Sequence, residues 1–373
     1  MKAFWIALSA VLVVAVALVA IIIANRGGDK YLAGDPAQSA SPSTSVSVSP
    51  SGTPASASPS ASPTPYSGPV DPLTGLPADA SVISNRPYAI MINNLSTAQP
   101  QLGISKADII YEILVEGGIT RMMAIFQDVS QAGEIGSIRS ARPYFVDIAN
   151  GYDAVYIHAG GSPDAYTELK LIGITHLDGV NGGKTDIFYR DKSRLKMGYE
   201  HSLVSTSALI QKFLPTYGVR LVHNDGFKSS MTFSDKAAPA GGLAAESVTV
   251  HFSSSKTTVF TYSDADKLYY ITQYKKDYID GNDKTKVGVT NVLVLKTRIK
   301  VISGDDKGRI DVDTVGSGTG IFICGGKYEE IKWSRKNNSS QFVFTREDGK
   351  PLVFGTGKTY VCVADKGNAV DFK

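Results

Sequence analysis

The hydrophobic pattern opens with one long apolar segment, residues 3–24, which is interrupted only by Ser9. Its length matches the roughly 20 residues that a membrane helix requires. A cleaved signal peptide usually has a shorter apolar core followed by a small-residue cleavage site, and this segment ends at Asn25 and Arg26 without a clear one. We therefore expect residues 1–26 to form an uncleaved membrane anchor. No cysteine follows the segment, which excludes a lipid attached there.

The next segment, residues 27–70, is rich in serine, proline, alanine and threonine and has almost no bulky apolar side chain. Such a composition cannot bury a core, so a disordered stalk is expected. Ser/Pro-rich stalks commonly stand outside a membrane. This favours a single-pass protein of the cell membrane whose globular part is extracytoplasmic. The charges that flank the apolar segment are too balanced for the positive-inside rule to decide the orientation.

Short strands are predicted where ordered sequence begins, near Val70. Residues 86–94, 109–116 and 121–128 combine β-branched, aromatic and other apolar side chains over strand-like lengths. The glycines at 117–118 separate the second of these segments from the third and favour a turn. The pattern therefore predicts that the second and third strands pair as a hairpin.

Within residues 136–171 the pattern alternates between helix and strand. A helix is predicted to start at Pro143, because the first helical turn does not use the N–H group that proline lacks. The segment 153–158 is too short and too β-branched for a buried helix and predicts a buried strand that ends at His158. A Gly-Gly turn and a second helix follow. This alternation predicts an α/β or α+β domain with a mixed sheet over residues 71–228.

The pattern changes again beyond residue 228. Residues 229–373 consist of short β-branched and aromatic segments separated by turns, which is typical of an all-β domain. We therefore expect a mainly β C-terminal domain. An alternative is that part of this region pairs with the first domain and makes one mixed body.

The first predicted domain contains a long loop, residues 173–201, which is rich in glycine and polar residues. Loops of this length in a compact domain are more often functional than not. A helix is expected to follow, with Ser202 or Ser205 as its N-cap and a stop at Pro215 and Gly218.

Composition limits the chemistry that the chain can perform. A net charge of +3 on 373 residues is too small and too dispersed for a nucleic-acid face. The two cysteines, Cys324 and Cys362, could form a disulfide in an oxidising space or remain as buried thiols in a β-core. The five histidines show no ligand spacing and no C-x-x-C pair exists, so neither a metal nor a cofactor is expected.

The main candidate site lies where the predicted strand ending at His158 meets the next helix. Ser162 is placed to cap that helix, and the N–H groups at a helix start favour an anion. Arg139 and Arg142 precede the strand and could add forked counter-charges suited to a carboxylate or phosphate. The alternative is that Ser162 only caps the helix and that both arginines are at the surface or ion-paired. The full candidate set for ligand binding comprises Arg139, Ser140, Arg142, His158, Gly160, Gly161, Ser162, Asp164, Arg190, Asp191 and His201.

Three further charged residues, Glu112, Glu116 and Arg121, fall near the ends of the predicted hairpin. They are interpreted as rim residues rather than functional ones, since surface ion pairs are common and weak. His201, just ahead of a predicted helix, could equally point into solvent.

Catalysis is less well supported than binding. Ser162 follows His158 by four residues and has Asp164 nearby, but the G-x-S-x-G motif of many hydrolases is missing. Glycoside hydrolysis requires two opposed carboxylates at a defined separation, which a sequence does not give. The candidates for such a pair are Glu112, Glu116, Asp164 and Asp191.

Several motifs resemble one bacterial family. They are ADIIYEILVEGGITR at 107–121, GSIRSARPYFVDIANGYDAVYIHAGGSPDAY at 136–166, FYRD at 188–191 and the looser GGKYEEIKW at 325–333. Together they resemble the YerB-type lipoprotein family, a family of unknown function with an N-terminal and a C-terminal part, from about residue 71 to the end. Members are often anchored through a lipidated cysteine, where this chain has an apolar segment.

The resemblance implies an extracytoplasmic position but no established activity, cofactor or catalytic residue. We therefore expect a membrane-anchored protein that binds a polar or anionic envelope ligand, a cell-wall component or an envelope protein, and no nucleic acid. The alternative is a cell-envelope hydrolase or glycosidase-like enzyme.

Overall fold

The structure is a computed structural model that describes residues 67–183 and 185–373. These residues belong to one compact unit, Thr64–Lys373. The anchor expected over residues 1–26 and nearly all of the stalk expected over residues 27–70 lie outside the described residues. In the part of the chain that is described, no helix has both the length and the apolar character that a membrane crossing requires.

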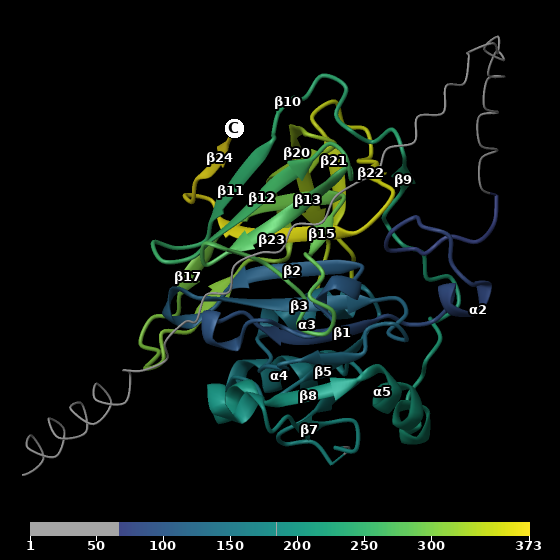
Figure 1. Cartoon of the computed structure of the whole chain (residues 1–373), viewed down its shortest axis with the longest axis vertical. Helices are drawn as coiled ribbons and strands as arrows, with labels where there is room; N and C mark the ends of the chain where they lie inside the picture. The colour runs from purple at the N-terminus through teal and green to yellow at the C-terminus, as the bar shows by residue number, and fades with distance from the viewer. Residues whose placement is uncertain (1–66, 184) are drawn as a thin grey trace, which may run out of the picture. The chain divides into compact units, whose positions relative to one another are not determined.

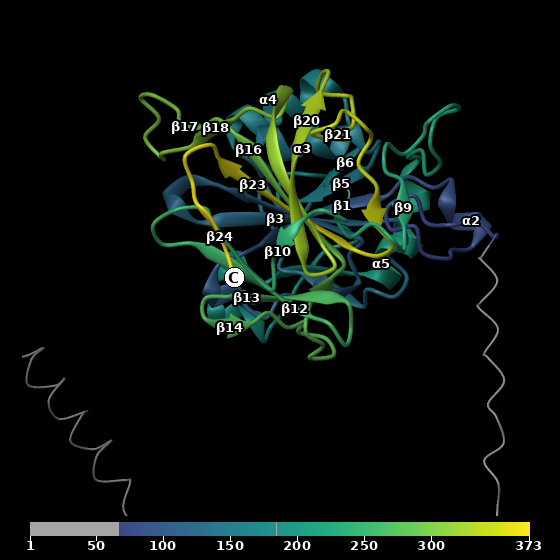
Figure 2. The same ribbon diagram turned by 90° about the horizontal axis from the view of Figure 1, so that it is seen from above.

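A sheet of eleven strands runs through the described residues (Figures 1 and 2). Its order is β10-β20-β19-β16-β23-β2-β3-β1-β5-β6, and β21 pairs with β20 beside this path. Its strands from the first half of the chain are β1 (Tyr88–Asn93), β2 (Ile109–Leu114), β3 (Thr120–Phe126), β5 (Val155–His158) and β6 (His176–Asp178). Those from the second half are β10 (Leu243–Ala244), β16 (Asn291–Thr297), β19 (Gly316–Cys324), β20 (Lys327–Arg335), β21 (Val343–Arg346) and β23 (Thr359–Asp365).

The two halves of the chain share this sheet because β2 pairs with β23 in parallel. The register runs from Ile109 opposite Thr359 to Ile113 opposite Val363. The contacts β1–β5, β5–β6 and β16–β23 are also parallel, whereas β2–β3, β1–β3 and β19–β20 are antiparallel. The expected mixed sheet and predicted hairpin are therefore confirmed, and the C-terminal region is mostly antiparallel as expected. Strand pairing nevertheless crosses the boundary expected near residue 228.

A second sheet of six strands in the described residues has the order β14-β13-β12-β11-β24, with β15 paired to β13. Its strands are β11 (Ser247–His251), β12 (Thr257–Ser263), β13 (Leu268–Gln273), β14 (Lys276–Asp277), β15 (Gly288–Val289) and β24 (Val370–Phe372). Buried side chains of this sheet, such as Val250 and Phe260, form one hydrophobic cluster with Ile90 and Met122 of the large sheet. The second sheet therefore covers one face of the large sheet.

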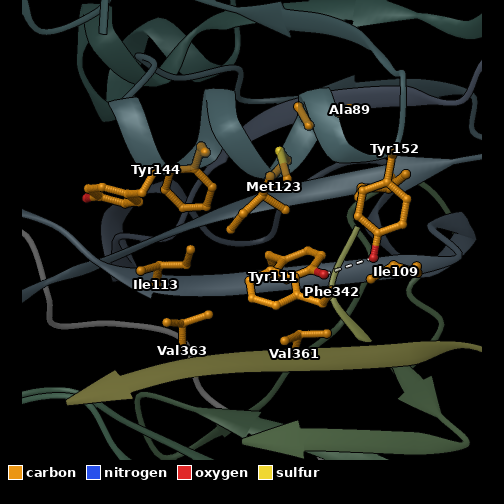
Figure 3. Close-up of a cluster of buried hydrophobic side chains, with 14 of the residues drawn as sticks. Ala89, Ile109, Tyr111, Ile113, Met123, Tyr144, Tyr152, Phe342, Val361 and Val363 are labelled. Atoms are coloured by element: carbon orange, nitrogen blue, oxygen red, sulfur yellow. Dashed lines mark hydrogen bonds between the residues drawn. The ribbon is translucent and has the colours of Figure 1, made fainter. Parts of the chain in front are cut away.

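The described α-helices are α2 (Ala80–Ile83), α3 (Pro143–Gly151), α4 (Pro163–Ile172) and α5 (Ser207–Phe213). Of these, α3 and α4 cover the opposite face of the large sheet, whereas Ile210 of α5 is buried in the cluster on the side of the second sheet. Phe145 and Ile148 of α3 are buried in one cluster with Met123 of β3. The close-up in Figure 3 shows this cluster, including the hydrogen bond between the hydroxyl groups of Tyr111 and Tyr152 (2.8 Å). Both helices predicted from the sequence around residues 136–171 are therefore present.

Short elements complete the described fold. The strand pairs and triplet outside the two sheets are β4 (Glu134–Gly136), β7 (Tyr189–Arg190) and β8 (Leu203–Thr206), β9 (Phe233–Ser234) with β22 (Phe354–Gly355), and β17 (Ile299–Val301) with β18 (Ile310–Val312). The 3-10 turns are η1 (Ser96–Ala98), η2 (Ile104–Lys106), η3 (Glu116–Gly118), η4 (Arg194–Met197), η5 (Tyr199–His201) and η6 (Leu214–Tyr217).

The helix expected after residue 201 begins later than predicted. Its first residues form strand β8, which pairs with β4 and β7, so Ser202 and Ser205 are not its N-cap. The cap is Thr206, whose Oγ1 accepts a hydrogen bond from the N–H of Leu209 (3.0 Å). Strand pairing with distant residues overrides the local helical spacing here, which is a common effect of tertiary context.

Both cysteines are free and buried, Cys324 at the end of β19 and Cys362 in β23. Of the two alternatives left open by the sequence, buried thiols are therefore the one observed. Burial raises the pKa of the Cys324 thiol to about 11, which keeps it protonated at neutral pH.

Candidate functional site

Charged side chains gather at the edge of the large sheet where the parallel strands β1, β2 and β5 end. Because β3 is antiparallel to β1, its first residues lie at the same edge, and Arg121 is opposite Asn93. The segment before α3 crosses this edge, since the Arg139 N–H bonds to the Met91 carbonyl and the Ala159 N–H bonds to the Arg139 carbonyl. Ligand sites in α/β proteins commonly lie at such strand ends.

Three arginines and one glutamate meet at this edge, and we call Glu116, Arg121, Arg139 and Arg142 the arginine cluster. Arg142 Nε lies 3.0 Å from Glu116 Oε2, and a second guanidinium nitrogen contacts Oε1. Arg121 Nη2 lies 3.6 Å from the same Oε1, and its Nη1 donates to the Ser140 carbonyl at 2.8 Å. The Glu116 carboxylate is therefore the counter-ion of both Arg121 and Arg142.

Mutual repulsion among the arginines shows in their electrostatics. Arg121 is 5% exposed, and burial together with the charge of Arg142 lowers its pKa to about 10. Burial alone would raise the pKa of Glu116, but the hydrogen bond from Arg142 and the charge of Arg121 lower it. Glu116 is therefore ionised. Its single negative charge does not balance the two positive charges of Arg121 and Arg142.

Arg139 is the least satisfied member of the arginine cluster. It is half-buried, and its guanidinium makes no hydrogen bond to any described residue. Burial lowers its pKa despite the opposing charge of Glu200, a residue whose side chain is itself exposed. Two guanidinium groups beside Glu116 and a third without a hydrogen bond leave a local excess of positive charge.

Tyr156 adds an unsatisfied hydroxyl to this region. The residue is fully buried in β5, and its hydroxyl has no hydrogen-bond partner among the described residues. Burial raises its pKa well above the usual value, while the nearby charges of Arg121 and Arg142 lower it in part. Buried polar groups are normally hydrogen-bonded, so this hydroxyl is an exception that calls for an explanation.

His158 does not join the arginine cluster. It is fully buried, its Nδ1 lies 2.8 Å from the Gly160 carbonyl and its Nε2 lies 3.0 Å from His176 Nδ1. Burial lowers its pKa to about 4, so the ring is neutral at neutral pH. Asp178 supports the same turn by accepting from the Gly160 N–H (2.7 Å) and the Tyr166 hydroxyl (2.6 Å). We interpret His158 as a residue that fixes this turn.

Ser162 caps α4 and is only 4% exposed, with Oγ accepting from the Ala165 N–H at 3.2 Å. The Ser162 hydroxyl therefore bonds to the helix backbone, and the imidazole of His158 bonds to Gly160 and His176. A Ser162–His158 nucleophile pair is not formed. Asp164 is exposed in the first turn of α4, and Gly161 pairs with Ala141 in a short bridge.

The loop residues of the candidate set divide into two groups. Arg190 stacks over the Tyr199 ring (3.6 Å to its centroid), and Asp191 accepts from the N–H and hydroxyl of Ser193. These two residues order the loop itself. His201 is instead 4% exposed, and its Nδ1 accepts from Asn93 Nδ2 at 2.8 Å, so it does not point into solvent.

Glu112 is not a rim residue. Its side chain is fully buried and lies 3.0 Å from Lys256 Nζ, between the two sheets. The prediction failed because Glu112 faces the second sheet, and a single strand pattern does not show that an opposite charge arrives there from another part of the chain.

A cavity of about 540 Å³ adjoins the arginine cluster at Arg142, between the starts of α3 and α4 and the β17–β18 hairpin. Ser162 and Asp164 of the candidate set also line it. The sequence missed its remaining charged residues, which are Asp147, Glu168, Arg298, Lys300, Arg309 and Asp311. A volume of this size is within the range of small-molecule sites, roughly 300–1,000 Å³.

Two of the missed residues, Asp147 and Glu168, form a carboxyl pair in this cavity. Burial and then the charge of Glu168 raise the pKa of Asp147 to about 7, and Asp147 Oδ1 has no hydrogen-bond donor in the described residues. Asp147 lies on α3 and Glu168 on α4, so their approach depends on helix packing that no local spacing reveals. Of the glycosidase candidates named from the sequence, only Asp164 lines the cavity.

Comparisons with known proteins agree on one family. Residues 73–220 match the "Protein of unknown function (DUF3048) N-terminal domain", and residues 248–361 match the corresponding C-terminal domain. A relative from Bacillus subtilis (strain 168), named "Putative lipoprotein YerB", is 31% identical over 293 residues, which cover 78% of this chain and 84% of the relative. The crystal structure of YerB protein from Bacillus subtilis is similar with a TM-score of 0.69 at 27% identity, over 81% of this chain and 99% of that chain.

Proposed function

Because the chain belongs to the YerB-like family, which contains the N- and C-terminal domains of DUF3048, we propose that it is an envelope protein that binds an anionic ligand at the arginine cluster. The relative named as a lipoprotein supports a position at the membrane surface. In this chain the apolar residues 3–24 would supply a single-pass anchor in place of the lipid, with the globular part outside.

The observation that carries the proposal is the unbalanced charge of the arginine cluster. Arg121 and Arg142 share Glu116, whereas the Arg139 guanidinium makes no hydrogen bond to a described residue. Holding like charges together in a half-buried place costs free energy, and a bound anion would recover it. Guanidinium groups are well suited to this role because they bind carboxylates and phosphates through two parallel hydrogen bonds.

The shape of the site indicates a ligand larger than a single anion. Arg142 belongs both to the arginine cluster and to the lining of the 540 Å³ cavity. An anionic group at the cluster would therefore leave room for the rest of the molecule beside Tyr144 and the β17–β18 hairpin. We propose a carboxylated or phosphorylated component of the envelope as the ligand class.

The test is calorimetric titration of the full-length protein with inorganic phosphate and with citrate. Arg139→Ala should weaken binding of both by at least about tenfold, the equivalent of one charge-assisted hydrogen bond of about 1.4 kcal/mol. A matched control is Arg346→Ala. This variant removes an arginine that is similarly part-exposed but is paired with Glu329 and does not belong to the arginine cluster. Equal affinity in parent, Arg139→Ala and control proteins would reject the proposal.

A second candidate function, hydrolysis of an envelope glycan, is favoured by the Asp147–Glu168 pair. Asp147, with a pKa raised to about 7 by burial and by Glu168, could act as a general acid that gives a proton to the leaving oxygen. Release of new reducing ends from purified wall glycan measures this activity. Asp147→Asn should abolish the release, and an unchanged release would exclude the role.

A further inference from the structure

A second cavity of about 470 Å³ lies away from the arginine cluster. One wall is the segment after β1, with Ser96, Gln99 and Pro100, and the other is the β13–β14 hairpin, with Tyr274, Asp277 and Tyr278. The lining thus combines two aromatic rings with a few polar groups, the usual make-up of a site for a small organic ligand. The two walls are formed by parts of the chain that are far apart in sequence, residues 96–100 and 274–279.

Tyr274 is held in place by contacts of its hydroxyl group and of its ring. Its hydroxyl donates to the Asn94 carbonyl at 2.6 Å, and Lys256 Nζ lies 4.7 Å from its ring centroid. Tyr274 and Lys275 have φ angles of 51° and 61°, in the left-handed region where glycine or asparagine is the usual choice for a two-residue hairpin. The backbone conformation at Tyr274 is therefore less favourable than it would be for glycine or asparagine, although it places an aromatic ring at the cavity.

Gln99 presents an unmet hydrogen-bond donor in the same cavity. Its Nε2 is buried and has no acceptor in the described part of the chain. Leaving a buried amide donor unpaired costs free energy, so an oxygen atom supplied by a ligand would stabilise the arrangement. Asp277, on the opposite wall, could in turn accept from a ligand hydroxyl.

We propose that this second cavity binds one sugar ring of a glycan. A sugar ring has an apolar C–H face, which can pack on Tyr274, and oxygen atoms and hydroxyl groups around its rim for Gln99 and Asp277. The lining carries one charge of each sign, Lys276 and Asp277, so it offers a free anion no net positive charge. This binding is separate from the anion site of the proposed function and depends on different side chains.

The two sites lie on either side of one short segment. Thr97 Oγ1 lies 3.4 Å from His201 Nε2, and His201 in turn bonds to Asn93 at the sheet edge that carries Arg121. Ser96 and Gln99 of the same segment line the second cavity. No residue of the arginine cluster lines the second cavity, so a change in that cluster should leave the sugar site intact, which makes the two proposals separable.

The test is titration of the full-length protein with the trimer of N-acetylglucosamine, followed by tyrosine fluorescence or NMR. Its acetamido groups supply the oxygen acceptors that Gln99 requires. Gln99→Leu and Tyr274→Gly should each weaken binding by about tenfold or more, because each removes a direct ligand contact. Glycine suits the left-handed backbone at residue 274, so this variant should fold, and retention of the parental melting temperature checks that it does.

Two controls make the result specific. Tyr270→Ala removes another partly exposed tyrosine of β13, outside the cavity, and Arg139→Ala alters only the anion site. Both should bind the trimer within about twofold of the parent, since neither removes a contact. The inference fails if the parent protein shows no saturable binding, or if Gln99→Leu and Tyr274→Gly bind as the parent does. Loss of phosphate binding without loss of the trimer in Arg139→Ala would separate the two sites.

Discussion

Lys256 Nζ lies 3.0 Å from Glu112 Oε1, and both side chains are at most 2% exposed. Glu112 belongs to β2 of the large sheet, and Lys256 directly precedes β12 of the second sheet. The carboxylate also accepts from the hydroxyls of Thr120 (2.6 Å) and Tyr360 (2.7 Å). A buried ion pair with its remaining hydrogen bonds satisfied therefore joins segments from both halves of the chain.

We predict that breaking this ion pair on one side is strongly destabilising. Lys256→Met should lower the free energy of unfolding by about 3–5 kcal/mol, because the Glu112 carboxylate would remain buried without its counter-charge. The double variant Glu112→Leu/Lys256→Met should lose less than the single one. Urea denaturation measures both.

The control for this prediction is an exposed ion pair, Lys286 with Asp277, where Lys286→Met should leave the free energy of unfolding nearly unchanged. A cost for Lys256→Met as small as that of the control would contradict the structural role given to the pair.

We also predict that neither half of the chain folds alone. In residues 67–228, strand β2 would lose its partner β23 and the large sheet would gain an open edge. Glu112 would also lose both Lys256 and Tyr360. Circular dichroism and NMR of residues 67–228 should show an unfolded or aggregated chain, whereas a cooperative thermal transition of this fragment would contradict the prediction.

Much of the fold could be predicted because its local patterns agree with its tertiary structure. Pro143 starts α3 as expected, Ser162 caps α4, and the hairpin of β2 and β3 turns at the predicted glycines. The sharing of one sheet by both halves could not be predicted. The parallel pairing of β2 with β23 joins Ile109 to Thr359, about 250 residues further along the chain. Neither strand alone carries a sequence signal for such a distant partner.

His158 should make the stability of the protein depend on pH. Its pKa is lowered from 6.5 to about 4 by burial, so the unfolded chain takes up a proton that the folded chain rejects. Stability is therefore fully present above pH 6.5 and falls as the pH is lowered towards 4, by roughly 3 kcal/mol for this residue. Urea denaturation between pH 4 and pH 7 measures this fall.

The variant His158→Asn keeps a donor near the Gly160 carbonyl but does not titrate, so its stability should depend less on pH over the same interval. His176 also has a pKa lowered by burial, so the variant should keep part of the pH dependence. An identical pH profile for the two proteins would show that His158 is not held neutral by the fold.

Asp147 should act in the opposite direction. Burial and the charge of Glu168 raise its pKa from 3.8 to about 7, so the folded chain binds a proton that the unfolded chain releases. Its contribution to stability is fully present below pH 3.8 and is lost as the pH rises towards 7. Asp147→Asn should therefore be more stable than the parent at pH 8 and closer to it at pH 4.5 in thermal denaturation. A parent protein that is the more stable of the two at pH 8 would contradict this account.

The candidate site was only partly accessible from the sequence. The motif around residues 136–142 places Arg139 and Arg142 close together, and the structure adds Arg121 to them through the register of β3 on β1. Proximity in sequence groups His158 with these arginines, yet its ring is bonded to Gly160 and His176. Its burial in β5 was predictable from the apolar strand, whereas the direction of its hydrogen bonds was not.

The most direct test of the anion site is the position of an electron-dense anion in crystals of the protein soaked with tungstate. We predict an anomalous peak within hydrogen-bonding distance of the Arg139 guanidinium, close to Arg121 and Arg142, that disappears in crystals of Arg139→Ala. Anomalous peaks confined to exposed lysines or lattice contacts, with none at the arginine cluster, would contradict the proposal.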